Sequence, residues 1–322
     1  MSCLKKINIL FSSAGRRVEL INSFREAKEK LGIEGKLVGV DLDELAPALN
    51  FVDVKYKVPR LNSKDFIPTI IDICKKEQIS LIIPTIDTEL ELYSKNKKLI
   101  EESGAKVMVS DIDTTSIMRN KIETYKYLKK HGFGVPRLIT DEDIKYKNYS
   151  FPLFIKPLDG SSSINAFKIN NEKELMFFKE YIPNPMIQEF ADGPEYCVDV
   201  FSDFNSKLIT VVPKLRVAHR SGEITKAKVV KDREIIELTK KLVSILKPQG
   251  EINFDCIKTQ EGIKIIEING RFAGGAPISF KAGANSPEKL YRILQNEELE
   301  YNEDYTDGMI ALRFDDAVFL NI

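Results

Sequence analysis

Three polar residues interrupt an apolar strand pattern near the end of the chain. Residues 262–275, GIKIIEINGRFAGG, carry Glu267, Asn269 and Arg271 at successive i+2 positions. Side chains alternate between the two faces of a strand, so Glu267 and Asn269 should project from one face. Carboxylate and amide oxygens bind Mg²⁺, and a guanidinium group binds phosphate. The spacing predicts a site for a Mg²⁺-bound polyphosphate, although such a pattern standing alone would also suit a solvated strand.

The segment just before this strand supplies a third oxygen ligand. Residues 251–269 read as a hairpin that turns at Gly262 and brings Asp255 opposite Glu267 and Asn269. Cross-strand neighbours approach closely enough to share an ion. Apolar residues surround Asp255, so its strand should be largely buried. Three oxygen ligands together with phosphate oxygens and water suit Mg²⁺ better than a structural Ca²⁺ site.

A lysine in an apolar strand marks the middle of the chain. Lys156 lies within FIKP, and the loop GSSS at residues 160–163 follows it. A buried lysine is costly unless an anion or another partner is supplied. A glycine- and serine-rich loop offers N–H and hydroxyl donors that can cover phosphates. The alternative is an exposed hairpin turn with a lysine whose amino group reaches solvent.

Two further segments hold candidate ligand-binding side chains. Glu189 and Glu195 bracket a turn between apolar strands, where they could accept hydrogen bonds from a nucleotide base and ribose or simply be solvated. Residues 213–228 form the densest basic stretch of the chain, from which Lys214, Arg216 or Arg220 could reach phosphate or a substrate carboxylate. An ordinary solvated strand explains this basic stretch equally well.

The first part of the chain must position part of this site. Its apolar periodicity predicts strands that alternate with amphipathic helices. The strands are expected at residues 7–13, 36–43, 79–85 and 105–110, and the helices at residues 16–32, 64–78 and 87–104. Helical connections of this length imply a parallel sheet, whose ligands collect beyond the carboxyl ends of the strands. Residues 12–17, Asp41, Asp43 and 85–89 should lie at that edge.

The pattern then changes to an α+β arrangement. Further helices are expected at residues 115–131, 172–182 and 232–247, a polar linker at 141–150, and strands around 151–169, 186–190, 195–203 and from 207 onward. The predicted fold is therefore α/β at the front and α+β behind. We expect three parts, at residues 1–114, 115–190 and 191–322.

Composition excludes several classes of protein. The 322 residues include 48 basic and 48 acidic side chains, so nucleic acid and anionic membranes are not expected partners. The four cysteines form no CxxC pair and only two histidines exist, which argues against a zinc site or a Ser-His-Asp triad. No apolar run approaches the roughly 20 residues that span a bilayer. We expect a cytoplasmic enzyme.

Taken in order, these residues resemble the ATP-grasp superfamily. The matching positions are Lys121, Lys156 with its serine loop, Glu189, Glu195, Asp255, Glu267, Asn269 and Arg271. The resemblance extends over essentially the whole chain. It is strongest to one synthetase half of the carbamoyl phosphate synthetase large chain and to short stand-alone carboxylate–amine ligases such as the pyrrolysine-pathway ligase. Asp255 stands where the synthetase has glutamine, which favours the simpler ligases.

The resemblance implies an ATP-grasp fold behind a Rossmann-like pre-ATP-grasp domain, with ATP and Mg²⁺ or Mn²⁺ as cofactors. The residues that it assigns to ATP are Lys121, Lys156, Ser161, Ser162, Ser163, Glu189, Phe190, Ala191 and Glu195. Asp255, Glu267 and Asn269 would bind the metal. Arg271 would stabilise the transferred phosphoryl group, with Lys214 and Arg216 as further catalytic candidates.

The implied reaction joins a small-molecule carboxylate to an amine or ammonia through an acyl phosphate, with release of ADP and phosphate. One alternative is a nucleotide-binding subunit of a split, carbamoyl-phosphate-synthetase-like enzyme that needs a partner, and a homodimer is also open. A dinucleotide-dependent oxidoreductase is disfavoured because SSAGRR, residues 12–17, has only Gly15 of a GxGxxG turn.

Overall fold

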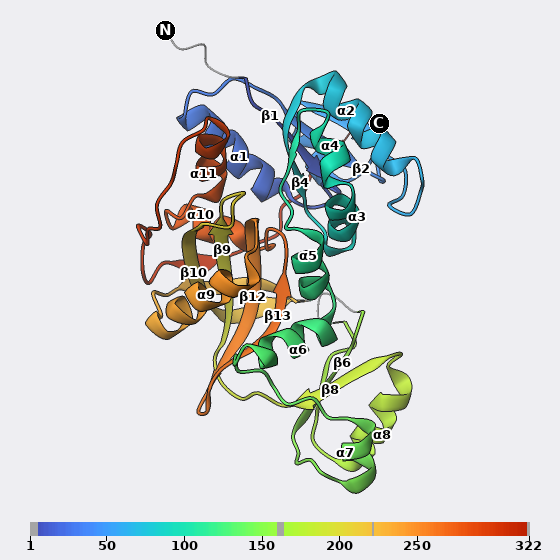
Figure 1. Ribbon diagram of the computed structural model, residues 1–322. Helices are drawn as coiled ribbons and strands as arrows, with labels where there is room; N and C mark the ends of the chain where they lie inside the picture. Colours follow the sequence, from blue (N-terminus) through green and yellow to red (C-terminus); the bar gives the residue numbers. More distant parts are fainter. Residues whose placement is uncertain (1–5, 160–163, 221, 321–322) are drawn as a thin grey trace.

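Three sheets organise the chain (Figure 1). The computed structural model describes residues 6–159, 164–220 and 222–320. The first sheet is parallel in the order β3-β2-β1-β4-β5. Its strands are β1 (Asn8–Ser12), β2 (Leu37–Asp41), β3 (Val54–Lys57), β4 (Ile79–Pro84) and β5 (Lys106–Val107). The parallel sheet predicted for the front of the chain is therefore confirmed, with β3 as an edge strand that the sequence pattern did not reveal.

Helices connect these strands in the three regions that the sequence pattern predicted, and the short helix η1 was not predicted. They are α1 (Val18–Lys30), η1 (Pro47–Asn50), α2 (Phe66–Glu77), η2 (Asp87–Glu89), α3 (Leu90–Lys95) and α4 (Lys97–Glu101). The helix expected at 87–104 is broken at Asn96, whose side chain donates to the carbonyl of Leu92 instead of pointing to solvent. Such local side-chain bonding competes with regular helix.

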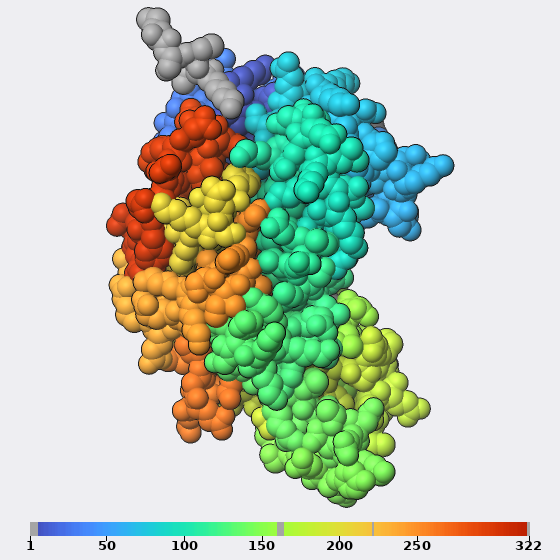
Figure 2. Space-filling view, viewed as in Figure 1, coloured from blue at the N-terminus to red at the C-terminus, as the bar shows by residue number. Residues whose placement is uncertain are grey.

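The second sheet belongs to a small lobe, which we call the lid. Its antiparallel strands, in the order β7-β6-β8, are β6 (Leu153–Pro157), β7 (Phe167–Ile169) and β8 (Pro185–Glu189). Helices α7 (Asp141–Tyr146) and α8 (Glu172–Tyr181) accompany it. The expected linker at 141–150 thus contains α7, which Thr140 and Asp143 cap reciprocally. Figure 2 shows the lid as a separate lobe at the lower end of the molecule.

Two short helices lead into the lid, α5 (Ile112–Arg119) and α6 (Lys121–Lys130). The sequence pattern predicted one helix at 115–131, but the chain is interrupted at Asn120. The Asn120 side chain accepts from the backbone N–H groups of Ile122 and Glu123, so it caps α6. The expected boundary at residue 114 falls inside α5.

The third sheet is the floor of the molecule and has six strands in the order β13-β12-β9-β10-β11-β14. Its strands are β9 (Glu195–Ser202), β10 (Leu208–Arg220), β11 (Glu223–Val229), β12 (Gly250–Thr259), β13 (Gly262–Asn269) and β14 (Ile310–Leu312). Helices α9 (Arg233–Leu246), α10 (Ala276–Lys281) and α11 (Ser286–Leu294) pack with it. Among the described residues, no helix has the length and apolar content that crossing a bilayer requires.

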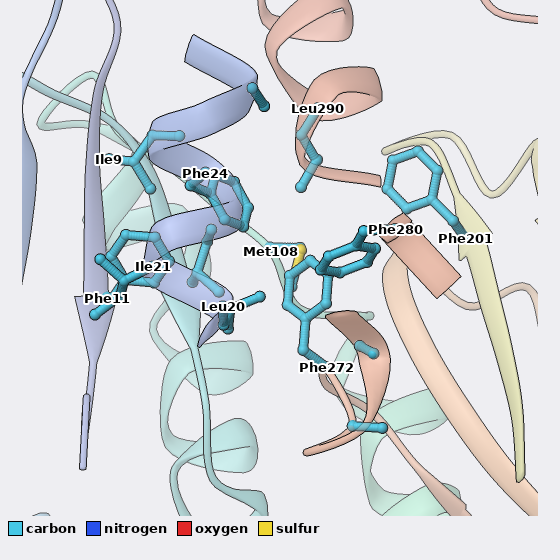
Figure 3. Close-up of a cluster of buried hydrophobic side chains, with 14 of the residues drawn as sticks. Ile9, Phe11, Leu20, Ile21, Phe24, Met108, Phe201, Phe272, Phe280 and Leu290 are labelled. Atoms are coloured by element: carbon cyan, nitrogen blue, oxygen red, sulfur yellow. The ribbon is translucent and has the colours of Figure 1, made fainter. Parts of the chain in front are cut away.

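An aromatic cluster joins the first sheet to the floor. Phe24 of α1 is fully buried, and its ring centroid lies 5.2 Å from that of Phe11, 5.9 Å from Phe272 and 6.0 Å from Tyr291. Figure 3 shows Phe24 pointing from α1 toward Phe272 and Phe280. Phe272 follows the predicted phosphate-binding Arg271 directly. The same core that joins the two parts therefore anchors the loop that carries Arg271.

We expect Phe24→Ala to lower the free energy of unfolding by about 3–5 kcal/mol, because it removes a buried ring and leaves a cavity. Urea denaturation followed by circular dichroism measures this change. Phe177→Ala is the matched control, because Phe177 of α8 is 59% exposed. A loss below about 1 kcal/mol for Phe24→Ala would show that the core can close around the missing ring.

Candidate active site

Two adjoining cavities lie between the lid, the floor and the first sheet. One measures about 350 Å³ and is bounded by the floor and the first sheet, and the other measures about 360 Å³ and lies between the floor and the lid. Both are lined by Lys121, Arg216, Asp255 and Glu267. These four side chains therefore mark the place where the cavities meet. We call the first the polar cavity and the second the lid cavity.

The β12–β13 hairpin supplies the floor of this meeting point. Asp255 pairs directly with Glu267, and Asn253 pairs directly with Asn269. A register shift after Asp255 leaves Ile266 unpaired, and Glu267 and Asn269 both line the polar cavity. The amide nitrogen of Asn269 donates to Asn253 at 3.2 Å, so the Asn269 oxygen is turned the other way. Asn253, which was not predicted as a site residue, lines the polar cavity, and its i−2 position relative to Asp255 places it on the same strand face.

The Asp255 carboxylate is buried with only part of its hydrogen-bonding capacity satisfied. One of its oxygens is buried without a hydrogen-bond partner among the described residues, and the other accepts from Arg216 at 3.1 Å. Burial raises the pKa of the Asp255 carboxyl to about 6; Arg216 opposes this shift and Glu267 adds to it. A cation would neutralise both carboxylates and supply the missing partner.

The arrangement of donors fits a divalent cation that brings ligands of its own. Within the part of the chain that the structure describes, no group of three or more His, Cys, Asp and Glu side chains could hold a metal ion. Asp255 and Glu267 offer two carboxylates and Asn269 one amide oxygen, which leaves coordination positions open. Mg²⁺ commonly uses one or two carboxylates together with water and substrate phosphates.

Arg216 links two of the predicted ligand-binding carboxylates. Its guanidinium lies 2.7 Å from Glu195 and 3.1 Å from Asp255. Because β9, β10 and β12 are neighbours in the floor, the three side chains meet on one sheet face. This position puts Arg216 at the meeting point of the two cavities.

Two lysines, one from the lid and one from α6, lie close to the place where the two cavities meet. Lys156 of β6 is only 7% exposed, and burial lowers its pKa while Glu267 opposes the shift. Lys121, at the start of α6, donates to the carbonyl of Leu158 at 2.7 Å; burial lowers its pKa too, again opposed by Glu267. The predicted Ser161, Ser162 and Ser163 lie outside the described residues.

The predicted hinge residues line the lid cavity. Glu189 ends β8, and Phe190 and Ala191 follow it along the same cavity wall. The Lys168 ammonium lies 4.1 Å from the Phe190 ring centroid, and Arg137 lies 3.6 Å from the Glu189 carboxylate. The cavity wall around the hinge thus combines an aromatic face with hydrogen-bonding groups.

Lys214 is not among the side chains that line either cavity. It is completely buried, pairs with Asp199 and donates to the carbonyl of Gly275 at 3.1 Å. Gly275 itself lines the polar cavity, so Lys214 lies behind the wall. Alternation along β10 puts Lys214 and Arg216 on one face, but only the structure shows that the loop before α10 covers Lys214.

Arg271 faces the polar cavity in contact with the first sheet. Its guanidinium donates to one oxygen of Asp87 at 2.7 and 3.2 Å. Asp87 lies in η2, beyond the carboxyl end of β4, at the edge where residues 85–89 were predicted to lie. Glu89 lies at the same edge but points inward, where its carboxylate accepts from Ser12 and from the backbone N–H of Thr85.

Two family models match the chain. Residues 9–108 match the PylC-like N-terminal domain, and residues 118–275 match the ATP-grasp domain. Curated relatives include the 3-methyl-D-ornithine–L-lysine ligase of Methanosarcina mazei, 25% identical over 67% of this chain and 55% of its own length, and that of Methanosarcina acetivorans, 24% identical over 80% and 66%. The D-alanine–D-alanine ligase of Pseudomonas entomophila is 23% identical over 53% of this chain and 60% of its own. The chain thus spans less than two thirds of the length of these relatives.

Solved structures share the fold over nearly the whole chain. The biotin carboxylase domain of Hydrogenobacter thermophilus 2-oxoglutarate carboxylase with MgADP has a TM-score of 0.73 and 17% identity, covering 94% of this chain and 73% of its own. N5-carboxyaminoimidazole synthetase of Staphylococcus aureus with ADP has a TM-score of 0.73 and 16% identity, covering 96% and 81%. An L-amino acid ligase of Bacillus licheniformis has a TM-score of 0.68 and 17% identity, covering 90% and 74%.

We expect the affinity for Mn²⁺, measured with saturating ADP, to fall as the pH drops through about 6. The folded-state pKa of Asp255 is raised to about 6, so protons compete with the cation up to that pH. Below it, each pH unit should weaken binding by up to about tenfold. Electron paramagnetic resonance of free Mn²⁺ measures the change.

The matched control is Glu261→Gln, which alters an exposed carboxylate at the turn of the same hairpin. It should bind Mn²⁺ as the unaltered protein does, whereas Asp255→Asn should bind weakly with a flatter pH profile. Because ADP titrates identically in every sample, the difference between proteins isolates Asp255. Equal profiles for all three proteins would contradict a metal at Asp255.

Proposed function

From the membership of this chain in the ATP-grasp superfamily, with a PylC-like domain at residues 9–108 and an ATP-grasp domain at residues 118–275, we propose that it is an ATP- and Mg²⁺-dependent carboxylate–amine ligase. The relatives named above join two amino acids, which supports small carboxylate and amine substrates for this chain. The observation that carries the proposal is the meeting of two cavities at one pair of facing carboxylates.

The geometry supports one orientation for the nucleotide. The base would occupy the lid cavity beside Phe190, with Glu189 near its amino group and Glu195 near the ribose. The phosphates would then reach the meeting point, where Lys121 and Lys156 supply positive charge. Burial lowers the pKa of both lysines, so their charged forms are less stable than in water. An incoming phosphate would stabilise these charged forms.

The polar cavity would hold the reacting carboxylate. An oxygen of that carboxylate attacks the γ-phosphorus of ATP, the bond to the ADP oxygen breaks, and an acyl phosphate forms. The amine then attacks the acyl carbon, phosphate leaves with the former C–O bond electrons, and the nitrogen loses a proton. A bound Mg²⁺ would neutralise charge on the phosphates, held by Asp255, Glu267 and Asn269.

The protein's own side chains would position and neutralise charge. Arg216 and Arg271 both line the polar cavity, from which they can reach the transferred phosphoryl group. Lys214 would act indirectly, because its hydrogen bond to the Gly275 carbonyl fixes the wall of that cavity. Each of the three parts would have its own role. Residues 1–114 and 191–322 would form the site for the carboxylate substrate, and residues 115–190 would close over ATP.

The test is phosphate release by the purified protein with ATP, Mg²⁺ and a panel of carboxylate and amine pairs. We expect ADP and phosphate only when both substrates are present, together with an amide product seen by mass spectrometry. Formation of AMP would contradict the acyl-phosphate route. Activity of the purified chain alone would also decide against a split enzyme that needs a partner subunit.

We expect Glu267→Gln to lower kcat/KM by about 100-fold or more, equivalent to about 2.7 kcal/mol of transition-state stabilisation. The substitution keeps the shape of the side chain but removes one of the two carboxylates that face each other. Glu261→Gln on the same hairpin serves as the control and should retain full activity. A fully active Glu267→Gln enzyme would contradict the assigned metal site.

A further inference from the structure

Asn253 connects two parts of the candidate site that the assignments above treat separately. It lies in β12, is 3% exposed and lines the polar cavity. It is paired directly with Asn269 of β13 on one side and with Asp199 of β9 on the other. Its side chain is hydrogen-bonded to the side chain of Asn269 and to the backbone of Arg271. Asn253 therefore contacts both a proposed metal ligand and the loop that carries the proposed phosphoryl-binding arginine.

The Arg271 carbonyl fixes which way the Asn253 amide faces. A backbone carbonyl has no hydrogen to donate, so only the nitrogen end of a side-chain amide can hydrogen-bond to it. Nδ2 of Asn253 donates to this carbonyl at 3.0 Å. The Oδ1 atom of Asn253 is thereby turned toward the neighbouring strand β13, where it accepts a hydrogen bond from Nδ2 of Asn269 at 3.2 Å.

The same direction is passed on to Asn269. An asparagine side chain carries an oxygen and an NH₂ group, and only the oxygen can bind Mg²⁺. Because its nitrogen is engaged by Asn253, Asn269 turns its oxygen the other way, and it lines the polar cavity together with Glu267. One carbonyl and two amides in series thus determine how a proposed ligand is oriented. Both ends of the Asn253 amide are engaged by protein groups, so Asn253 supports the metal site from behind.

The loop after β13 has anchors besides Asn253. Lys214 donates to the carbonyl of Gly275 at 3.1 Å and so holds the far end of the loop. Phe272 is fully buried and fixes its beginning. Because these anchors remain when Asn253 is changed, we expect the loop to stay folded and the effect to be confined to the Arg271 backbone and the amide chain.

We propose that Asn253 is a positioning residue, which turns the oxygen of Asn269 toward a bound divalent cation. The assignment rests on the proposed ligase function and adds a residue to its metal site. Side chains that hydrogen-bond to metal ligands fix the orientation of those ligands, and losing one commonly weakens metal binding about ten- to hundredfold. A leucine at this position would leave the Asn269 amide free to turn, whereas an aspartate would still accept a hydrogen bond from it.

Metal binding tests the proposal without turnover. The affinity for Mn²⁺ would be measured by electron paramagnetic resonance with saturating ADP in the unaltered protein, Asn253→Leu and Asn253→Asp. We expect Asn253→Leu to weaken Mn²⁺ binding about ten- to hundredfold. Asn253→Asp should bind Mn²⁺ at least as tightly as the unaltered protein, because its carboxylate accepts from Asn269 and adds a negative charge. Equal affinities in the unaltered protein and Asn253→Leu would overturn the proposal.

Melting temperatures identify a variant that no longer folds. Should Asn253→Leu be one, Asn253→Asp still decides, because weaker Mn²⁺ binding by Asn253→Asp would overturn the proposal. Gln260→Leu is the control, since it changes an exposed amide at the turn of the same hairpin. It should bind Mn²⁺ as the unaltered protein does.

A double-mutant cycle separates positioning from a general loss of structure. Because Asn253 acts through Asn269, Asn253→Leu should weaken Mn²⁺ binding strongly in the unaltered protein and only slightly in Asn269→Ala. Effects that multiply in the double variant would show that the two residues act independently, and the positioning role would then be wrong.

The positioning role and the ligase function can fail separately. Mn²⁺ binding that depends on Asn253 and is coupled to Asn269, without any ADP-forming turnover, would support the positioning role and contradict the ligase. Turnover of a carboxylate and an amine with an unaltered metal dependence in Asn253→Leu would support the ligase and overturn the positioning role. Absence of Mn²⁺ binding by the unaltered protein with ADP would contradict both.

Discussion

The candidate site depends on two carboxylates that face each other across a hairpin. Asp255 and Glu267 are directly paired on β12 and β13, and one Asp255 oxygen is buried without a partner among the described residues. Like charges directly opposite each other destabilise an antiparallel pair. Apolar side chains of the same hairpin are well packed, with Phe254, Ile265 and Ile268 in the core. The fold therefore holds in place an arrangement that the two carboxylates alone would disrupt.

The basic residues around this pair come from separate elements, so the overall architecture is needed to assemble them. Arg216 arrives on a neighbouring strand of the floor, Lys156 on the lid sheet and Lys121 at the start of α6. Arg271 is fixed differently, by Asp87 from the first sheet and by the burial of the adjacent Phe272 against Phe24. The aromatic cluster is thus a structural requirement of the site as well as of the core.

Features of the site that follow from local strand periodicity could be predicted from the sequence. Strand alternation predicted that Glu267 and Asn269 share a face, and the turn at Gly262 predicted that Asp255 faces Glu267. Periodicity could not show contacts between distant segments. The pairing of Arg271 with Asp87 joins residues from two sheets, and Lys214 and Arg216 look alike in sequence although only Arg216 lines a cavity. Helix ends at Asn96 and Asn120 were missed because side-chain bonding to the backbone outweighed the apolar pattern.

The charges shared by the two cavities would favour binding of the proposed metal and nucleotide together. Lys121 and Arg216 contribute two positive charges there, and Asp255 and Glu267 two negative charges. A polyphosphate alone would meet the carboxylates, and a divalent cation alone would meet the lysine and arginine. Since these interactions act at short range in a partly buried site, each repulsion is substantial. A cation bound to phosphate removes both repulsions at once, because it lies against the carboxylates while the phosphate oxygens lie against the basic residues.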